Sequence, residues 1–236
     1  QVVPEFYDPD LTIARADQLA ELSLKHGIPT TFSPLFVNAV NSDGVQRVMA
    51  RVADQFARGA RVWPQVQTRP IDISFCFAVP SMLLGRFRSW NQIMRHGTLA
   101  DKIAAFSDAE SRKTLISEAA SMGPLFSRLI LRQVASQENQ SLVGKSMAEI
   151  AEIRSTTPVE AMIDISLEEK LQAHFLAANM GHNDDEQVSR LLAHPLVHVG
   201  ASDGGAHILS FATYGDTSYL LGHFVRELGS IGLETA

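Results

Sequence analysis

A carboxylate stands where enzymes with parallel sheets carry their reactive groups. The apolar run 196–201 predicts a buried strand, and it ends in Ser202-Asp203-Gly204-Gly205-Ala206-His207. Such enzymes collect reactive side chains beyond the carboxyl ends of their strands, and Asp203 stands at that place. The two glycines leave space beside the carboxylate for a ligand or a metal ion. The alternative is that Asp203 caps a short helix or braces the turn.

The histidines near this carboxylate give a weaker indication of chemistry. His207 could reach a substrate or a metal ion, although a histidine in a turn more often supports its neighbours through hydrogen bonds. His194 and His198 are four residues apart, but Pro195 stands between them and the segment reads as a loop that leads into a strand. Packing and surface roles are therefore expected for these two histidines.

Two other catalytic motifs are excluded. Gly144-Lys145-Ser146 is similar to the end of a phosphate-binding loop, but that motif requires a glycine at the position of Asn139. Neither Ser33 nor Ser202 lies in a Gly-x-Ser-x-Gly elbow, so a serine-hydrolase triad has little support. Nucleotide binding and serine hydrolysis are not expected.

The composition indicates the size of the core and excludes some classes of partner. The 236 residues are 45% hydrophobic and 19% charged, which suits one large core or two modest ones. The net charge of -6 comes from charges scattered along the chain, so no nucleic acid partner is expected. No apolar stretch approaches the roughly 20 residues of a membrane span, and there is no signal pattern, so a cytoplasmic protein is expected. Cys76 lies in an apolar run and is expected to be buried.

Strands and helices alternate over much of the chain, which favours a parallel sheet, either open or closed as a barrel. The expected strands are 1–6, 29–36, 61–67, 171–177 and 196–201. The expected helices are 11–26, 43–58, 82–87, 109–119, 147–154, 158–163, 184–192 and 219–228. Residues 80–140 read as an irregular helical insertion, whose aromatic residues favour core packing over a lid or a subunit contact.

The two ends suggest that the chain is part of a longer protein. It opens on Gln1 without an initiator Met, and 232–236 has the pattern of the first turn of a further helix. We therefore expect one partial catalytic domain over 1–236, lacking its first strands and its C-terminal segment.

The segments 185–195 and 199–207 resemble the late-barrel region of D-aminoacylase-like amidohydrolases, which include the N-acyl-D-amino-acid deacylases. The likeness continues over 214–227 and 232–236, and residues 63–70 and 144–151 are similar to one subgroup of that family. The resemblance implies the later part of a (β/α)8 barrel and hydrolysis of a carbon-nitrogen amide bond in a small molecule. It also implies a divalent metal, zinc above all, in the full-length protein.

The same resemblance implies roles for individual residues. Asp203 matches the aspartate that accepts a proton from the attacking water and delivers one to the departing nitrogen, and it is also a candidate metal ligand. Gln65 and Arg69 would contact the substrate, the latter by pairing with a carboxylate; the alternative is that Arg69 is a surface residue or braces a loop. Glu5, at the end of the first strand, is a candidate ligand or base. Ser202, Gly204 and His207 complete the expected substrate contacts.

The sequence departs from the family pattern at the metal ligands. The early His-x-His pair would precede Gln1, and the two middle strands, at 31–34 and 62–65, hold Ser33 and Gln65 where relatives place histidines. The metal site is therefore not complete in this chain, and metal binding by this chain alone stays open. A non-catalytic binding protein derived from the barrel, or an enzyme fragment that is inactive without the rest of the chain, is the alternative, and a homo-oligomer stays open.

Overall fold

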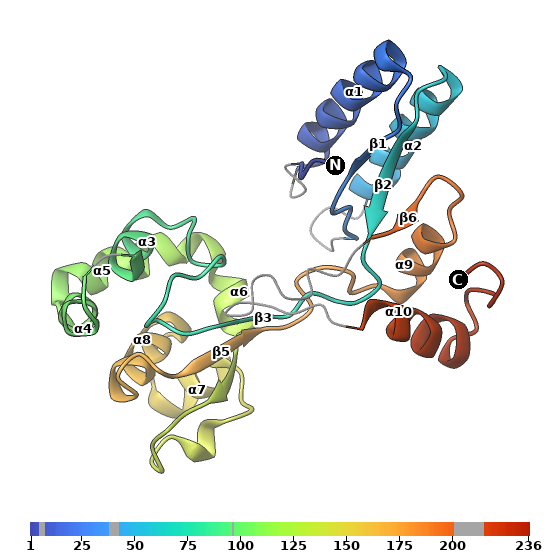
Figure 1. Ribbon diagram of the computed structural model, residues 1–236. Helices are drawn as coiled ribbons and strands as arrows, with labels where there is room; N and C mark the ends of the chain where they lie inside the picture. The colour runs from blue at the N-terminus through green and yellow to red at the C-terminus, as the bar shows by residue number, and fades with distance from the viewer. Residues whose placement is uncertain (5–7, 38–42, 96, 201–214) are drawn as a thin grey trace. The chain divides into compact units, whose positions relative to one another are not determined.

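The computed structural model describes residues 1–4, 8–37, 43–95, 97–200 and 215–236, and these fall into two units. Unit 1 holds the described parts of 1–71 with 179–200 and 215–236, and unit 2 holds the described parts of 72–178. Figure 1 shows the two units. The expected insertion at 80–140 falls within unit 2.

Unit 1 is built on a parallel sheet. Its strands, in the order β1-β2-β6, are β1 (Thr30–Phe32), β2 (Val62–Val66) and β6 (His198–Val199). Both pairings are parallel, and an isolated bridge adds Val2 beside Phe32 in the same direction. The predicted parallel sheet is thus confirmed for unit 1. Within the described ranges the sheet is open, so the closed barrel that the resemblance implies is not seen there.

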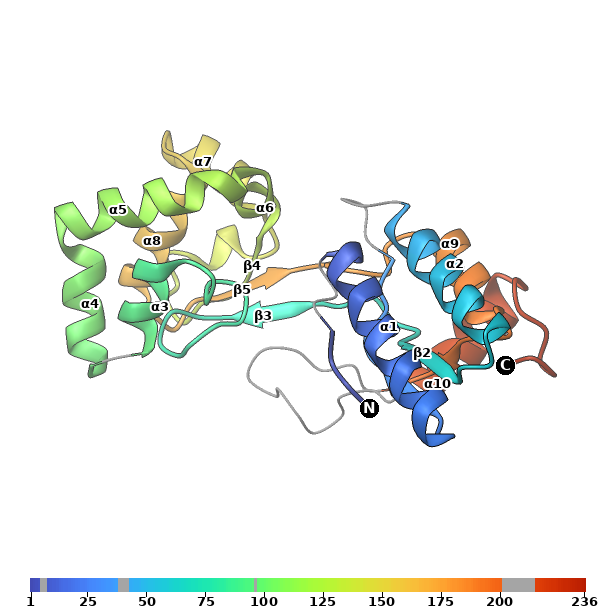
Figure 2. The same cartoon turned by 90° about the horizontal axis from the view of Figure 1, so that it is seen from above.

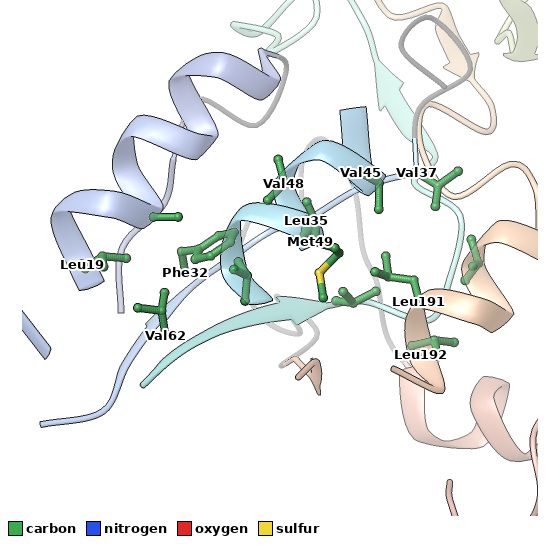
Figure 3. Close-up of a cluster of buried hydrophobic side chains, with 14 of the residues drawn as sticks. Leu19, Phe32, Leu35, Val37, Val45, Val48, Met49, Val62, Leu191 and Leu192 are labelled. Atoms are coloured by element: carbon green, nitrogen blue, oxygen red, sulfur yellow. The ribbon is translucent and has the colours of Figure 1, made fainter. Parts of the chain in front are cut away.

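Helices cover the sheet of unit 1. They are α1 (Pro9–His26), α2 (Gly44–Ala57), α9 (Asp185–Leu192), α10 (Asp216–Tyr219) and η3 (Leu220–Glu227). One hydrophobic core joins strand residues such as Phe32 and Val62 to Leu19 of α1, Val48 of α2 and Leu191 of α9 (Figure 3). This core fixes the strands whose carboxyl ends carry the candidate site.

Local signals in the sequence set the helix boundaries. Asp8 caps α1 by accepting from the amides of Asp10 (2.9 Å) and Leu11 (3.3 Å), and Gly27 ends the helix with a left-handed φ of 67°. Asp184 caps α9 by accepting from the Gln187 amide at 3.0 Å. Caps of this kind act over about three residues, so a short stretch of sequence contains the whole signal.

Unit 2 contains an antiparallel sheet, in the order β3-β5-β4, with helices packed around it (Figure 2). The strands are β3 (Ile73–Phe75), β4 (Ile130–Gln133) and β5 (His174–Ala177). The helices are α3 (Arg88–Arg95), α4 (Leu99–Ser107), α5 (Ala109–Ala119), η1 (Ala120–Met122), α6 (Gly123–Arg128), η2 (Gln140–Leu142), α7 (Met147–Arg154) and α8 (Pro158–Glu168). The prediction that 171–177 is a strand of the parallel sheet was wrong, because β5 pairs antiparallel with both of its neighbours.

The aromatic residues of the insertion form the core of unit 2. Trp90 is fully buried, and its Nε1 donates to the carbonyl of Leu115 at 3.0 Å. Its ring lies 5.2 Å from that of Phe77, 5.8 Å from Phe106 and 6.3 Å from Phe126. Core packing, expected for these aromatic residues, is confirmed. Cys76 is also buried, as predicted.

Three predicted elements differ in the structure. Residues 82–87 form turns, since Gly85 closes a single turn on the carbonyl of Ser81 and the helix begins only at Arg88. The strand at 196–201 was expected to be long and buried, but β6 has two exposed residues at the sheet edge, with Val199 41% exposed. The last helix, η3, is wound as a π-helix. No helix in the described ranges is long and apolar enough to cross a membrane.

Candidate active site

The carboxyl edge of the unit 1 sheet is held together beyond the ends of its strands. The amide of Leu35 donates to the carbonyl of Gln65 at 3.1 Å, and that of Gly200 donates to Val66 at 2.7 Å. A Cβ on Gly200 would lie 3.0 Å from the Cβ of Gln65, so only glycine fits without a shift of the neighbouring chain. The chain therefore leaves β6 directly beside the exit of β2.

Most of the predicted site residues lie outside the described residues. Asp203 follows Gly200 by three positions in the sequence, and with Ser202, Gly204 and His207 it belongs to the undescribed segment 201–214. Glu5 belongs to the undescribed segment 5–7. Their expected roles stay predictions.

Gln65 and Arg69 are described, and both belong to β2 and its continuation. Gln65 is half-buried, and its Oε1 accepts from Nε2 of Gln1 at 2.9 Å. The Arg69 guanidinium lies over the ring of Tyr219, 5.6 Å from the ring centre, which is a cation-π distance. The Tyr219 ring thus holds the guanidinium in place just beyond the strand.

A buried carboxylate is fixed to the same segment. Asp216, at the start of α10, accepts through Oδ1 from the Thr68 amide and the Thr68 hydroxyl, both at 2.9 Å. The hydroxyl also lies 2.8 Å from the Asp216 carbonyl. The other carboxylate oxygen, Oδ2, is buried and has no hydrogen-bond partner among the described residues. Thr68 therefore ties α10 to the segment that follows β2, through one carboxylate oxygen of Asp216.

Two further buried polar side chains near this edge lack partners in the described part of the chain. Gln67 directly follows β2, is 5% exposed and leaves Oε1 unpaired. His182 is 1% exposed, and neither ring nitrogen has a partner. Burial lowers the pKa of His182 to about 4, so its imidazole is neutral at pH 7. Unpaired buried polar atoms cost folding free energy, about 1–3 kcal/mol each.

The described residues do not form a metal site by themselves, since none of them gather into a group of three histidine, cysteine or acidic side chains that could hold an ion. The His194 Nδ1 accepts from the Leu196 amide at 3.1 Å, and the His198 ring stacks on Trp63 at 4.3 Å. The packing and surface roles expected for both histidines are thus confirmed.

His223 links two helices of unit 1 through charged groups. Its Nε2 lies 3.0 Å from Asp185 of α9, and its Nδ1 lies 3.0 Å from Glu227 of η3. The hydrogen bond with Glu227 raises the pKa of His223, burial opposes this, and Asp185 adds to the rise. The protonated imidazole, which carries a proton on both ring nitrogens, is thus the form that can donate to both carboxylates.

The His223 contacts predict a pH-dependent contribution to stability. Because its folded pKa is raised, the contribution is full below the unfolded pKa of about 6.5 and disappears as pH rises through the folded pKa. We expect wild type to exceed His223→Gln in unfolding free energy at pH 5.5 by up to about 1 kcal/mol, because the carboxylates are solvent-exposed. Urea unfolding at pH 5.5 and 8.5 checks this. A difference in unfolding free energy between wild type and His223→Gln that is larger at pH 8.5 than at pH 5.5 would contradict this prediction.

The fold and the edge geometry define an α/β protein with a parallel sheet that carries polar groups at its carboxyl end. No protein-family model matches the chain. In structure the chain resembles D-aminoacylase, which is described as defining a subset of amidohydrolases, with a TM-score of 0.50 and 17% identity. That likeness covers 99% of this chain and 39% of the other, and it concerns the fold.

Other proteins are also similar to parts of this chain. The zinc-bound N-acyl-D-glutamate deacylase of Bordetella bronchiseptica is 17% identical, with a TM-score of 0.49, over 94% of this chain and 36% of that one. Uncharacterised proteins of Mycobacterium bovis and Mycobacterium tuberculosis are 33% identical over 76 residues, which is 32% of this chain and 12% of theirs. The chain thus spans well under half of each of these relatives.

Sequence reasoning missed three residues of this region. Gln67, His182 and Asp216 were not singled out, because their burial depends on segments far apart in the chain. Thr68 and Asp216, for example, are 148 positions apart. The only local indication was that Gln67 is the last residue of the predicted strand 61–67.

Proposed function

We propose that this chain is the later part of the catalytic barrel of a metal-dependent amidohydrolase. The reaction is hydrolysis of a carbon-nitrogen amide bond in a small molecule, and an N-acyl-D-amino acid is the proposed substrate class. The observation that carries the proposal is the 2.7 Å hydrogen bond from Gly200 to Val66. It joins the exit of β6, three residues before Asp203, to the exit of β2, where Gln65 and Arg69 stand.

Each residue at this edge of the sheet has its own proposed role. Asp203 accepts a proton from the attacking water and delivers one to the departing nitrogen. Arg69 pairs with a substrate carboxylate, and its contact with Tyr219 supports this by fixing the guanidinium. Gln65 binds the substrate through its amide, and Ser202, Gly204 and His207 complete the contacts.

A divalent ion, zinc by preference, is the proposed cofactor of the full-length protein, with Asp203 and Glu5 as proposed ligands. When bound, such an ion lowers the pKa of water and polarises the amide carbonyl. Among the described residues, the unpaired buried atoms of His182, Gln67 and Asp216 are groups that would accept a cation.

The test is metal analysis of the full-length gene product, together with a screen of N-acyl-D- and N-acyl-L-amino acids. We expect bound divalent metal, hydrolysis of a D-substrate, and loss of that hydrolysis after chelation with recovery on addition of zinc. A protein that binds such amides without cleaving them, with or without metal, would instead be a non-catalytic binding protein.

A further inference from the structure

One helical turn of unit 1 holds two consecutive residues of the segment that follows β2. The first is Thr68, whose amide and hydroxyl donate to Oδ1 of Asp216, both at 2.9 Å. The second is Arg69, whose guanidinium lies 5.6 Å from the ring centre of Tyr219. Asp216 and Tyr219 are the first and last residues of α10. Residues three apart on a helix are neighbours, so both contacts come from one side of this turn.

The backbone of Arg69 is fixed by the residues on either side of it. Thr68 is fully buried, and the Asp216 carboxylate that accepts its hydrogen bonds is only 5% exposed. Hydrogen bonds to an ionised acceptor are stronger than those between neutral groups. On the other side, Pro70 restricts the backbone conformations open to the residue before it. The arginine side chain therefore starts from a fixed point, and only its own torsions remain to be ordered.

The Tyr219 ring orders that side chain, and the core of unit 1 orders the ring. Tyr219 is half-buried, and its ring lies edge-to-face against that of Phe224, with 5.9 Å between their centres. Phe224 is 1% exposed and belongs to the hydrophobic core of the unit. The ring of His223 lies against Tyr219 as well, at 4.8 Å. The support of the guanidinium thus continues into packed residues of η3.

Ordering an arginine before it meets its ligand strengthens binding. A side chain that must be ordered on binding loses conformational entropy, which weakens the complex. A guanidinium held on an aromatic ring has lost part of that entropy in advance. Contact with a ring face also does not consume the N–H donors, which lie in the guanidinium plane and match the two oxygens of a carboxylate.

We propose that Tyr219 is a positioning residue for Arg69, and that it thereby determines a preference for amides that carry a carboxylate beside the scissile bond. The proposal rests on the proposed function, in which Arg69 pairs with the substrate carboxylate. It adds a residue of α10 that sets the substrate class. Tyr219 acts through Arg69 and is assigned no contact with the substrate.

The experiment compares, in the full-length protein, two amides that differ only in the carboxylate. N-acetyl-D-leucine and N-isopentylacetamide form such a pair, and the best substrate of the screen forms another with its own decarboxylated analogue. In Tyr219→Leu we expect KM for the carboxylate-bearing amide to rise about 3–30-fold, which corresponds to the loss of a cation-π contact. The kcat value should change little, because the carboxylate is bound equally in the ground state and the transition state. Hydrolysis of the carboxylate-free amide should be unchanged.

Three further variants separate positioning from loss of structure. Tyr219→Phe keeps the ring and should behave as wild type. Phe56→Leu removes another half-buried ring of unit 1, on α2, and should leave KM unchanged for both amides. In an Arg69→Leu background, Tyr219→Leu should have no further effect on KM, because the group that it positions is absent. Thermal melting checks that each variant folds, and Tyr219→Met replaces Tyr219→Leu if the latter does not.

The outcomes distinguish the positioning role from the enzyme. A rise in KM that is confined to the carboxylate-bearing amide and absent in the Arg69→Leu background supports the proposal. No rise, or an equal loss with both amides, overturns it and leaves an amidohydrolase that binds its substrate otherwise. If the wild-type protein cleaves neither amide, the proposed function fails, and calorimetry measures the dissociation constants of both compounds in the same variants. Equal binding of the two by wild type, or equal weakening in Tyr219→Leu, then overturns the positioning role, whereas selective weakening with the carboxylate supports it.

Discussion

Replacing Asp203 by asparagine is expected to lower amide hydrolysis by about 10²–10⁴-fold, the range that general acid-base catalysis contributes. Asparagine has nearly the same shape but can neither accept the proton of the attacking water nor pass one to the leaving nitrogen. If Asp203 acts in this step, kcat falls more than KM rises, since the loss concerns the transition state. Steady-state kinetics with the best substrate of the screen measures both.

A matched control tests whether the effect is specific. Asp54→Asn makes the same chemical change at an exposed position of α2 and should leave kcat/KM unchanged. Circular dichroism and thermal melting should show that both variants fold. Unchanged hydrolysis in Asp203→Asn would remove the assigned role.

Glu169 is expected to be the carboxylate whose loss destabilises unit 2 most. One oxygen accepts from the amides of Ala135 (2.8 Å) and Ser136 (3.0 Å), and the other accepts from the Ser136 hydroxyl and, at 2.8 Å, from the Asn139 Nδ2. Burial alone would raise the pKa of Glu169, but these hydrogen bonds outweigh it and lower the pKa to about 2. In Glu169→Gln, an amide NH₂ would replace one carboxylate oxygen. It could not accept hydrogen bonds from the donors that face that oxygen.

The lowered pKa converts into a pH-dependent stability. Since the unfolded value is 4.5, the contribution is full above that pH and is lost as pH falls toward 2. The difference amounts to about 3 kcal/mol of unfolding free energy. We expect Glu169→Gln to be less stable by about that amount at pH 7, with a gap that narrows at lower pH. Urea unfolding at pH 3–7, followed by fluorescence, measures it.

Glu138 provides the comparison for Glu169. It lies in the loop that Glu169 contacts, between β4 and η2, but is exposed, so Glu138→Gln should change stability by well under 1 kcal/mol. A Glu169→Gln protein as stable as this control at pH 7 would show that the hydrogen bonds to the carboxylate contribute little.

The elements that could be predicted are those defined by nearby residues. Thr157 and Pro158 mark the start of α8, Gly27 marks the end of α1, and the structure has both boundaries where they were expected. Capping and helix propensity act within one turn, so a sequence window contains the whole signal. The parallel pairing of β1 with β2 likewise follows from the helix between them.

Pairing between distant segments could not be predicted. Nothing in the apolar run at 73–75 specifies that β3 pairs antiparallel with β5, a hundred residues later. The burial of His182 depends on Val37 and Ile71, and the place of Asp216 depends on Thr68. At the candidate site, the family resemblance pointed to Gln65 and Arg69, whereas the groups that distant chain segments enclose were missed.

The junction of the two units has a consequence for protein engineering. On the unit 1 side, Ile71 bonds to Met180 and Gly181, and on the unit 2 side Ile73 pairs with Ala177. The points where the chain leaves unit 1 and returns to it are therefore neighbours. A short turn joining 71 to 180 would span them, which makes 72–179 a removable segment and offers a shortened chain for dissecting the parallel sheet alone.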